Sequence, residues 1–364
     1  MSSISSDIQA PVPVPGVAAI ERLREGGGER SGLVPLDRNE RLSPLPDAIL
    51  DELRSAIDGP ALTEYPILDG AYADLGAAAG LARERLLLTS GSDAAFRALH
   101  FAYVRPGDRV TMLDPSYAMY AVYAAMFQAE PAKVPFNADM SLDVDRVLAA
   151  VEGSRLVLIA NPNQPTGTVL SEEALRAVID AAAGALVVID EAYFPFSRTT
   201  VLPWVEEHPN LVVTRTFSKA WGLAGLRLGF AAGHPDVIRT LFKVRSVYDI
   251  ASLSAAALRV VLAHPEVADD YVAEVDAGRA VVSARAAELG LQPLESPTNF
   301  MQIRVGHRAD PATLTEALAE RGFLVKGPAP ASCLRDCIRA TLGPPALMER
   351  FSDALAESLE ATAR

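Results

Sequence analysis

From about residue 86 onward, short apolar runs alternate with longer alanine-rich stretches. The short runs predict strands, because a strand that is buried on both faces is apolar along its whole length. The predicted strands are Leu86–Thr89, Arg109–Leu113, Leu156–Ala160, Leu186–Ile189, Leu211–Arg215 and Leu226–Ala231. The stretches between them predict helices, among them Asp93–Tyr103, Tyr117–Gln128 and Glu172–Ala182. This alternation predicts βαβ units and an α/β fold, with a mostly parallel sheet that helices cover on both faces.

The pattern changes after about residue 252, where a long helical region over Ser254–Glu288 begins. The elements predicted beyond it are a strand at Thr298–Val305, a helix at Pro311–Arg321, strands at Phe323–Lys326 and Cys337–Leu342, and a helix at Pro345–Thr362. This arrangement predicts a smaller α+β domain, which the helix-like stretch Pro46–Ala56 joins. We therefore expect a large domain over residues 60–252 and a small domain over 34–59 and 253–364.

The first 33 residues differ from the rest of the chain. They combine a Pro/Val-rich start, a helix-like stretch at Val17–Arg24 and three consecutive glycines at 26–28, which predicts a flexible N-terminal arm. The arm has no basic segment followed by an apolar one, so we do not expect a secretory signal.

Charge and cysteine content exclude several classes of protein. The 33 Lys and Arg against 46 Asp and Glu give the 364-residue chain a net charge of −13, which disfavours nucleic acid as a partner. No apolar run approaches the roughly 18 residues of a membrane span. Cys333 and Cys337 cannot form a disulfide framework, and no second pair completes a zinc site. We therefore expect a reduced, cytoplasmic protein with no metal and no membrane association.

The run Thr216–Arg227 is the strongest candidate for chemistry. Lys219 follows a predicted strand, and burial can lower the pKa of a lysine until its amine becomes a nucleophile toward aldehydes. Arg227 offers a planar pair of donors that suits a phosphate, and the Ser218 hydroxyl can add another donor. Taken alone, the run is equally compatible with a surface lysine and a structural arginine in a glycine-rich turn.

A second candidate follows the apolar strand at Leu186–Ile189. Asp190 is predicted to lie at the carboxyl edge of the sheet, where open α/β sheets bind ligands. Its carboxylate can keep a pyridine nitrogen protonated, and Tyr193 can form a hydrogen bond with a ring hydroxyl. An acidic helix start after a buried strand explains the same residues, and this motif alone does not decide between the two.

Three further loops follow predicted strands. Asn163 or Gln164 can aim an amide at a flat ligand. Ser92 and Asp93 open a helix whose N–H groups can hold a phosphate, although the same residues also suit a helix cap. Tyr117 can stack on an aromatic ring, or it can be a packing residue.

Because all these side chains follow strands of one predicted sheet, the sequence resembles the fold-type I pyridoxal-phosphate enzymes. Within them it is similar to the class I/II aminotransferases of the histidinol-phosphate aminotransferase kind, over about Leu36–Leu355. The runs that carry the resemblance are Glu64-Tyr65-Pro66, Gly91-Ser92-Asp93, Pro115-Ser116-Tyr117, Asp190-Glu191-Ala192-Tyr193, Ser218-Lys219-Ala220 and Leu223-Ala224-Gly225-Leu226-Arg227. The resemblance implies a mostly parallel seven-stranded sheet, a smaller α+β domain and pyridoxal 5'-phosphate as cofactor.

The resemblance also implies catalytic roles. Lys219 would bond to the cofactor aldehyde and later move a proton of the substrate. Asp190 would pair with the ring nitrogen, so that the ring accepts electrons. Tyr193 would contact the ring hydroxyl together with the amide of Asn163 or Gln164.

Further implied roles concern the phosphate, the substrate and the second subunit. The groups implied to hold the cofactor phosphate belong to Ser92, Asp93, Ser218 and Arg227. Tyr117 would stack on the ring, and Tyr65 would reach the phosphate from the other subunit, which implies a homodimer with a shared active site. Arg339 would anchor the carboxyl or phosphate end of the substrate, with Arg335 as the weaker candidate.

Four positions depart from the pattern of these relatives. Gln164 stands in place of an Asn, Lys326 in place of an Arg, and the run that ends at Ser43 lacks a substrate-contacting Tyr. Asp249 stands where relatives tend to have Asn, and it is either a helix-start acid or a carboxylate for a cationic substrate. Histidinol phosphate and a specialised amino acid therefore both remain candidate substrates.

The sequence thus predicts an aminotransferase that acts between an amino acid, expected to be glutamate with 2-oxoglutarate as its partner, and a keto or aldehyde acceptor. A decarboxylase of the same fold is an alternative, because the substrate anchor decides which bond breaks. A DNA-binding regulator is disfavoured, because the N-terminal segment is short and not basic.

Overall fold

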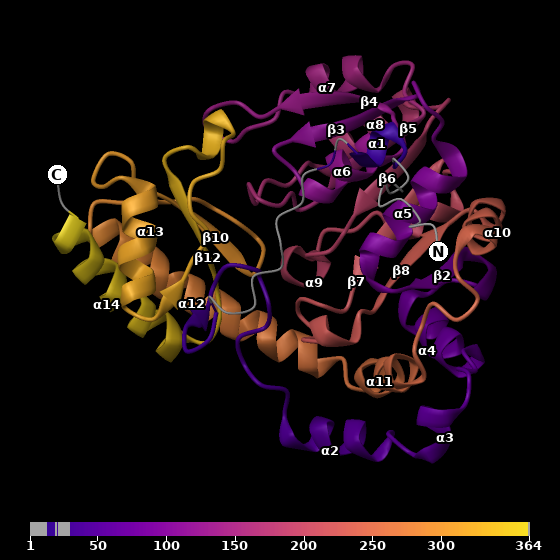
Figure 1. The fold of residues 1–364 in the computed structure, drawn as a ribbon, viewed down its shortest axis with the longest axis horizontal. Coiled ribbons are helices and arrows are strands. Elements are labelled where there is room, and N and C mark those ends of the chain that lie inside the picture. Colours follow the sequence, from indigo (N-terminus) through magenta and orange to yellow (C-terminus); the bar gives the residue numbers. More distant parts are fainter. Residues whose placement is uncertain (1–12, 19, 21–29, 363–364) are drawn as a thin grey trace, which may run out of the picture.

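A seven-stranded sheet is the centre of the larger part of the protein (Figure 1). The structure, a computed structural model, describes residues 13–18, 20 and 30–362. Within them, the strand order of this sheet is β2-β8-β7-β6-β5-β3-β4. The strands are β2 (Leu86–Thr89), β3 (Arg109–Asp114), β4 (Glu130–Pro135), β5 (Leu156–Ala160), β6 (Leu186–Asp190), β7 (Leu211–Thr216) and β8 (Gly229–Gly233). Strand β8 pairs antiparallel with β2 and β7, and the other pairings are parallel, which confirms the predicted α/β class.

Two of these strands differ from the prediction. Strand β4 was not predicted, because it lies at the edge of the sheet and its exposed residues break the apolar pattern. The strand predicted from Leu226 begins instead at Gly229. Ala224–Leu226 form a short 3-10 helix, and Arg227 adopts a left-handed conformation with φ of 51°.

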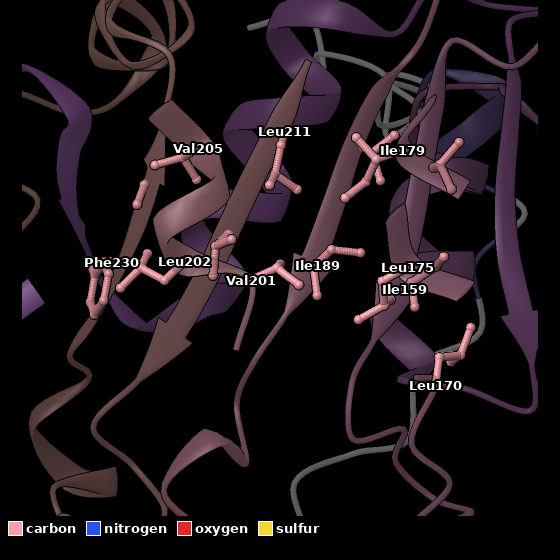
Figure 2. Close-up of a cluster of buried hydrophobic side chains, with 14 of the residues drawn as sticks. Ile159, Leu170, Leu175, Ile179, Ile189, Val201, Leu202, Val205, Leu211 and Phe230 are labelled. Atoms are coloured by element: carbon pink, nitrogen blue, oxygen red, sulfur yellow. The ribbon is translucent and has the colours of Figure 1, made fainter. Parts of the chain in front are cut away.

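Helices cover both faces of the sheet. One face carries α5 (Gly91–Tyr103), α6 (Ala118–Met126) and α10 (Pro235–Val244), and the other carries α4 (Asp69–Ala79), α7 (Val144–Val151), α8 (Glu172–Ala181), the 3-10 helix η2 (Leu202–Glu206) and α11 (Ser252–Ala263). Figure 2 shows part of the second face, where Leu175 and Ile179 of α8 lie over Ile159 and Ile189 of the sheet. Ser171 caps α8 by accepting the Ala174 N–H.

The smaller part of the protein is built on a three-stranded sheet, with a separate two-stranded sheet beside it. Strand β10 (Phe300–Arg304) pairs antiparallel with β9 (Gln292–Pro293) and β12 (Cys337–Thr341), and β1 (Val34–Pro35) pairs in parallel with β11 (Phe323–Leu324). Helices α12 (Glu266–Glu288), α13 (Pro311–Glu320) and α14 (Pro345–Thr362) pack on it. Tyr193, Phe196 and Ala220 belong to the same apolar cluster, so the two parts meet beside the predicted site.

The long helical region predicted over Ser254–Glu288 consists of two helices. Helix α11 ends at Ala263 and α12 begins at Glu266, and Pro265 between them has no N–H to continue the first helix. Helices α2 (Asp47–Ser55) and α3 (Gly59–Thr63) pack on α11, which itself packs on α4 of the large domain. We therefore propose that the large domain ends at the break at Pro265 and that α2 belongs to the large domain.

The remaining described elements lie near the N-terminus and beside the site. Helix α1 (Pro15–Ala18) packs on α6, and α9 (Phe194–Ser197) follows Tyr193. Most of the predicted stretch Val17–Arg24 lies outside the described residues, as does most of the predicted flexible arm. In the described part of the chain, no helix combines the length and apolar character that a membrane crossing requires. The same residues include no cluster of three or more His, Cys, Asp or Glu that could hold a metal ion.

Candidate active site

A cavity of about 510 Å³ lies where the carboxyl ends of the large-sheet strands face strand β12 of the smaller sheet. The residues predicted for the site that line it are Ser92, Asp93, Tyr117, Asp190, Tyr193, Ser218, Lys219, Arg227 and Arg339. Another cavity, of about 520 Å³, is lined mainly by apolar side chains and contains none of the predicted residues. The fold therefore gathers most of the predicted chemistry at one place.

One end of the cavity is the start of helix α5. Gly91 has a φ of 71°, and a Cβ atom built there would lie 2.6 Å from Nη2 of Arg227. A Cβ atom at Gly229 would lie 2.8 Å from the backbone nitrogen of Ser92. The absence of both side chains lets the guanidinium and the first N–H groups of α5 come together, which is a site suited to a phosphate.

Asp190 is buried at the end of β6. Its carboxylate accepts hydrogen bonds from the Tyr120 hydroxyl at 2.8 Å and from the Thr214 hydroxyl at 3.1 Å. Burial raises the pKa of Asp190 to about 6, and the two hydroxyl bonds oppose that rise. The carboxylate is therefore fixed in orientation and poised to gain from a cationic partner.

Lys219 lies in the loop that follows β7. Its Nζ donates a hydrogen bond to the carbonyl of Arg38 at 3.0 Å. Burial, followed by the positive charge of Arg339, lowers the pKa of Lys219 to about 8, while Glu40 acts in the opposite direction. A substantial share of neutral amine at physiological pH makes this lysine a nucleophile.

Tyr193 is held by a residue that the sequence analysis did not select. The side-chain amide of Asn39 donates to the Tyr193 hydroxyl at 2.8 Å. Burial raises the pKa of Tyr193 to about 12, and the bond from Asn39 counteracts part of that effect. The signal in the sequence is the Asn39-Glu40 pair, which opens the run that ends at Ser43.

The loop after β5 places Asn163 and Gln164 differently. Asn163 is fully buried, and its amide donates to the Pro115 carbonyl at 3.0 Å and to the Thr166 hydroxyl at 2.9 Å. Its oxygen accepts from the Ser116 hydroxyl at 2.7 Å. Two of these bonds join Asn163 to the loop after β3 and the third stays within its own loop. Asn163 is not among the residues that line the cavity, whereas the neighbouring Gln164 is.

Three other candidates are not among the residues that line this cavity. Tyr65 is 72% exposed and stacks on Tyr248 with 3.9 Å between ring centroids. Arg335 is exposed and is not part of the cavity wall. Asp249 accepts the backbone N–H of Ser90 at 3.3 Å, next to the start of α5, which favours the structural interpretation of this carboxylate.

Two cations lie on the wall that the smaller sheet contributes. Arg339 of β12 is buried, and one of its terminal nitrogens donates to the Asp37 carbonyl at 2.7 Å. Its Nε has no partner among the described residues. The backbones of Arg339 and Lys326 exchange hydrogen bonds of 2.8 and 2.9 Å, so both side chains belong to the same cavity wall. This wall suits an anionic group of a ligand.

These groups fit pyridoxal 5'-phosphate. The glycine-lined start of α5 and Arg227 suit its phosphate, the Asp190 carboxylate suits its ring nitrogen, and the Lys219 amine suits its aldehyde. Fold and site together define a fold-type I pyridoxal-phosphate enzyme.

The comparisons give the family: the chain belongs to the class I and II aminotransferases, whose model matches residues 31–355. A histidinol-phosphate aminotransferase of Burkholderia lata is 36% identical over 327 residues, which cover 87% of this chain and 90% of the relative. Another, of Symbiobacterium thermophilum, is 35% identical and covers 99% of both chains. The crystal structure of histidinol-phosphate aminotransferase from Sinorhizobium meliloti in complex with pyridoxal-5'-phosphate is 25% identical, with a TM-score of 0.87 over 97% of this chain and 99% of that one. The chain is thus a pyridoxal-phosphate-dependent aminotransferase.

The close packing at Gly229 leads to a prediction for cofactor binding. Gly229→Ala places a Cβ atom against the backbone of Gly91 and Ser92, and it is expected to weaken pyridoxal 5'-phosphate binding by roughly tenfold or more. The control is Gly225→Ala, where the added Cβ meets no atom within 4 Å. Titration of both purified variants with the cofactor, followed by absorbance, gives the two dissociation constants. Equal constants would show that the glycine is not needed for the phosphate site.

Proposed function

We propose that this aminotransferase exchanges an amino group between glutamate and the keto or aldehyde form of an amine that carries a phosphate or carboxylate, with histidinol phosphate as the first candidate. The observation that carries the proposal is Arg339, a buried cation on the cavity wall with an unpaired Nε. Lys326 adds a second positive charge on the same wall. The names of the relatives that match nearly the whole chain support the choice of histidinol phosphate.

We propose the following roles at the reacting centre. Bound pyridoxal phosphate supplies a ring that accepts electrons from the substrate. The neutral Nζ of Lys219 would take the proton from the substrate carbon that bears the nitrogen and deliver it to a carbon of the cofactor. Asp190 keeps the ring nitrogen protonated, and Tyr193 with Gln164 contacts the ring hydroxyl. Gln164 replaces Asn163 in this proposal because it lines the cavity.

The proposed phosphate site combines backbone and side chains. The groups are the N–H groups of Ser92 and Asp93, the Ser218 hydroxyl and the Arg227 guanidinium, all on the cavity wall. The proposed role of Tyr117 is to stack on the ring, and its hydroxyl is held by Asp93 at 3.0 Å.

A spectroscopic titration tests the function. The cofactor-loaded protein is mixed with glutamate, histidinol phosphate, and aromatic, basic and phosphorylated amino acids in turn, and its visible absorption is followed. We expect glutamate and histidinol phosphate to bleach the visible band, with formation of 2-oxoglutarate from glutamate. Bleaching by another amine, with no response to histidinol phosphate, would reject that substrate and identify the true class directly.

We also propose a homodimer with shared active sites, located in the cytoplasm. Exposed apolar side chains of two segments support the dimer, and the segments touch where Tyr65 stacks on Tyr248. These side chains are Leu62, Tyr65, Ile67, Val247 and Tyr248. A second copy that covered this surface would bury them and bring Tyr65 to the partner's phosphate. The free, buried thiols of Cys333 and Cys337 support a reducing compartment.

Mixed dimers test the shared site. A Lys219→Ala chain and a Tyr65→Ala chain are each expected to be deficient, but a heterodimer of the two has one site with both residues intact. Random pairing should therefore restore about a quarter of the wild-type activity. The measurement is activity after the two variants are co-refolded or co-expressed in equal amounts. Activity no greater than the sum of the separate variants would contradict the proposed role of Tyr65.

A further inference from the structure

Asn39 is a buried residue of the cavity wall and adopts an uncommon backbone conformation. It is 2% exposed and has a φ of 57°, in the left-handed region that most side chains avoid and that Asn tolerates better than most. Its polar side chain is therefore placed in the interior at some cost, which its hydrogen bonds must offset.

The backbone of Asn39 is held by the smaller sheet. Its N–H donates to the Thr341 hydroxyl at 3.0 Å, and its carbonyl accepts from the Asn299 amide at 3.0 Å. The Thr341 hydroxyl uses its own proton toward the Leu36 carbonyl at 2.8 Å, so it acts as acceptor for Asn39. Thr341 lies two residues after Arg339 on β12. The position of Asn39 is thereby set by the strand that carries the proposed substrate anchor.

The side chain of Asn39 determines how the Tyr193 hydroxyl is used. Its Nδ2 lies 2.8 Å from the Tyr193 oxygen, and an amide nitrogen can only donate. Tyr193 therefore accepts this bond, and its own proton remains free for another acceptor. Tyr193 lines the cavity, with Phe300 packed edge-on against its ring at 5.3 Å between centroids. The phenol is thus fixed in place, and its proton is available on the cavity side.

We propose that Asn39 is a positioning residue that keeps the Tyr193 proton directed toward the ring-hydroxyl oxygen of pyridoxal phosphate. Because strand β12 holds the backbone of Asn39, the same strand sets the direction of that proton. The inference rests on the proposed contact between Tyr193 and the ring hydroxyl. A hydrogen-bond donor at the ring-hydroxyl oxygen offsets the negative charge of that oxygen. The Lys219 nitrogen, once bonded to the cofactor beside it, then holds its proton less tightly. Removing the Asn39 amide lets the Tyr193 hydroxyl turn away and reverses this effect.

The test is a pH titration of the visible absorption of the cofactor-loaded protein, without substrate. Asn39→Gly removes the amide and suits the left-handed backbone, so it is the variant expected to fold with least disturbance. The midpoint of the titration, the pH at which the absorption change is half complete, is expected to rise by about one pH unit in this variant. Asn39→Asp keeps the size of the side chain but accepts the Tyr193 proton, and its midpoint should rise at least as far.

A double-mutant cycle separates positioning from a general structural role. In a Tyr193→Phe protein, which has no hydroxyl to orient, Asn39→Gly should leave the midpoint unchanged. The proposal is overturned if Asn39→Gly does not shift the midpoint in the wild-type background, or if the same shift persists in Tyr193→Phe.

Failure of the proposed function looks different from failure of this inference. If glutamate and histidinol phosphate do not bleach the visible band, the substrate proposal fails, yet the substrate-free titration can still support or overturn the role of Asn39. The circular dichroism melting curve of each variant confirms that the compared proteins are folded.

Discussion

Lys219→Ala is expected to bind pyridoxal phosphate weakly and to lose turnover by roughly 10⁴-fold or more, because the same amine both bonds to the cofactor and moves the substrate proton. The matched control is Lys243→Ala, which removes an exposed lysine of α10 outside the cavity. The measurements are the steady-state rate with glutamate and the visible spectrum of each protein. A Lys219→Ala variant with the rate of the Lys243→Ala control would refute the central assignment.

The depressed pKa of Lys219 adds a pH dependence to this prediction. The amine reacts with the cofactor aldehyde only when it is neutral, and burial lowers its pKa to about 8. The rate at which the cofactor-free protein captures pyridoxal phosphate should therefore rise with pH and level off above about 8. Stopped-flow absorbance measures this rate. A rate that kept rising toward pH 10 would show a lysine with an ordinary, unshifted pKa.

Much of the fold could be predicted from sequence because the central strands are buried on both faces. Strands such as β5 and β6 consist of buried residues throughout, so their apolar runs stand out. Strand β4 has no such signal, since Glu130 and Pro135 at its ends are exposed and Val134 alone is buried. The helical region over Ser254–Glu288 gives no sharp signal for the break at Pro265, because the stretches on either side both favour helix.

The candidate site could be predicted wherever a residue directly follows a strand. The sheet fixes where such residues lie, and Asp190 and Lys219 therefore meet at one edge although 28 other residues separate them in sequence. Asn39 could not be found in this way, because its bond to Tyr193 joins residues 154 positions apart, where the larger and smaller parts of the protein pack together. The choice between Asn163 and Gln164 depends on side-chain direction within one turn, which composition does not encode.

Asp190→Asn is expected to bind the cofactor and to lose at least about a hundredfold in turnover, because a neutral amide cannot hold the ring nitrogen in its protonated form. Asn is nearly isosteric with Asp, so the contact with the buried Tyr120 and Thr214 hydroxyls changes in polarity more than in shape. The measurement is the steady-state rate, with the cofactor dissociation constant measured beside it. Turnover within a few-fold of wild type would reject the pairing with the ring nitrogen.

The same substitution distinguishes a catalytic role from a structural one through stability. Burial raises the pKa of Asp190 to about 6, so the cofactor-free folded protein holds this proton more tightly than the unfolded chain does. The stabilising contribution of that proton is present at low pH and is lost as pH rises through about 6. The melting temperature of cofactor-free Asp190→Asn minus that of cofactor-free wild type should therefore increase as the pH rises from 4 to 7, while the variant loses its turnover. A carboxylate that served only the fold would give the opposite result at pH 7, a less stable variant, because the wild-type charge would then be the stabilising form.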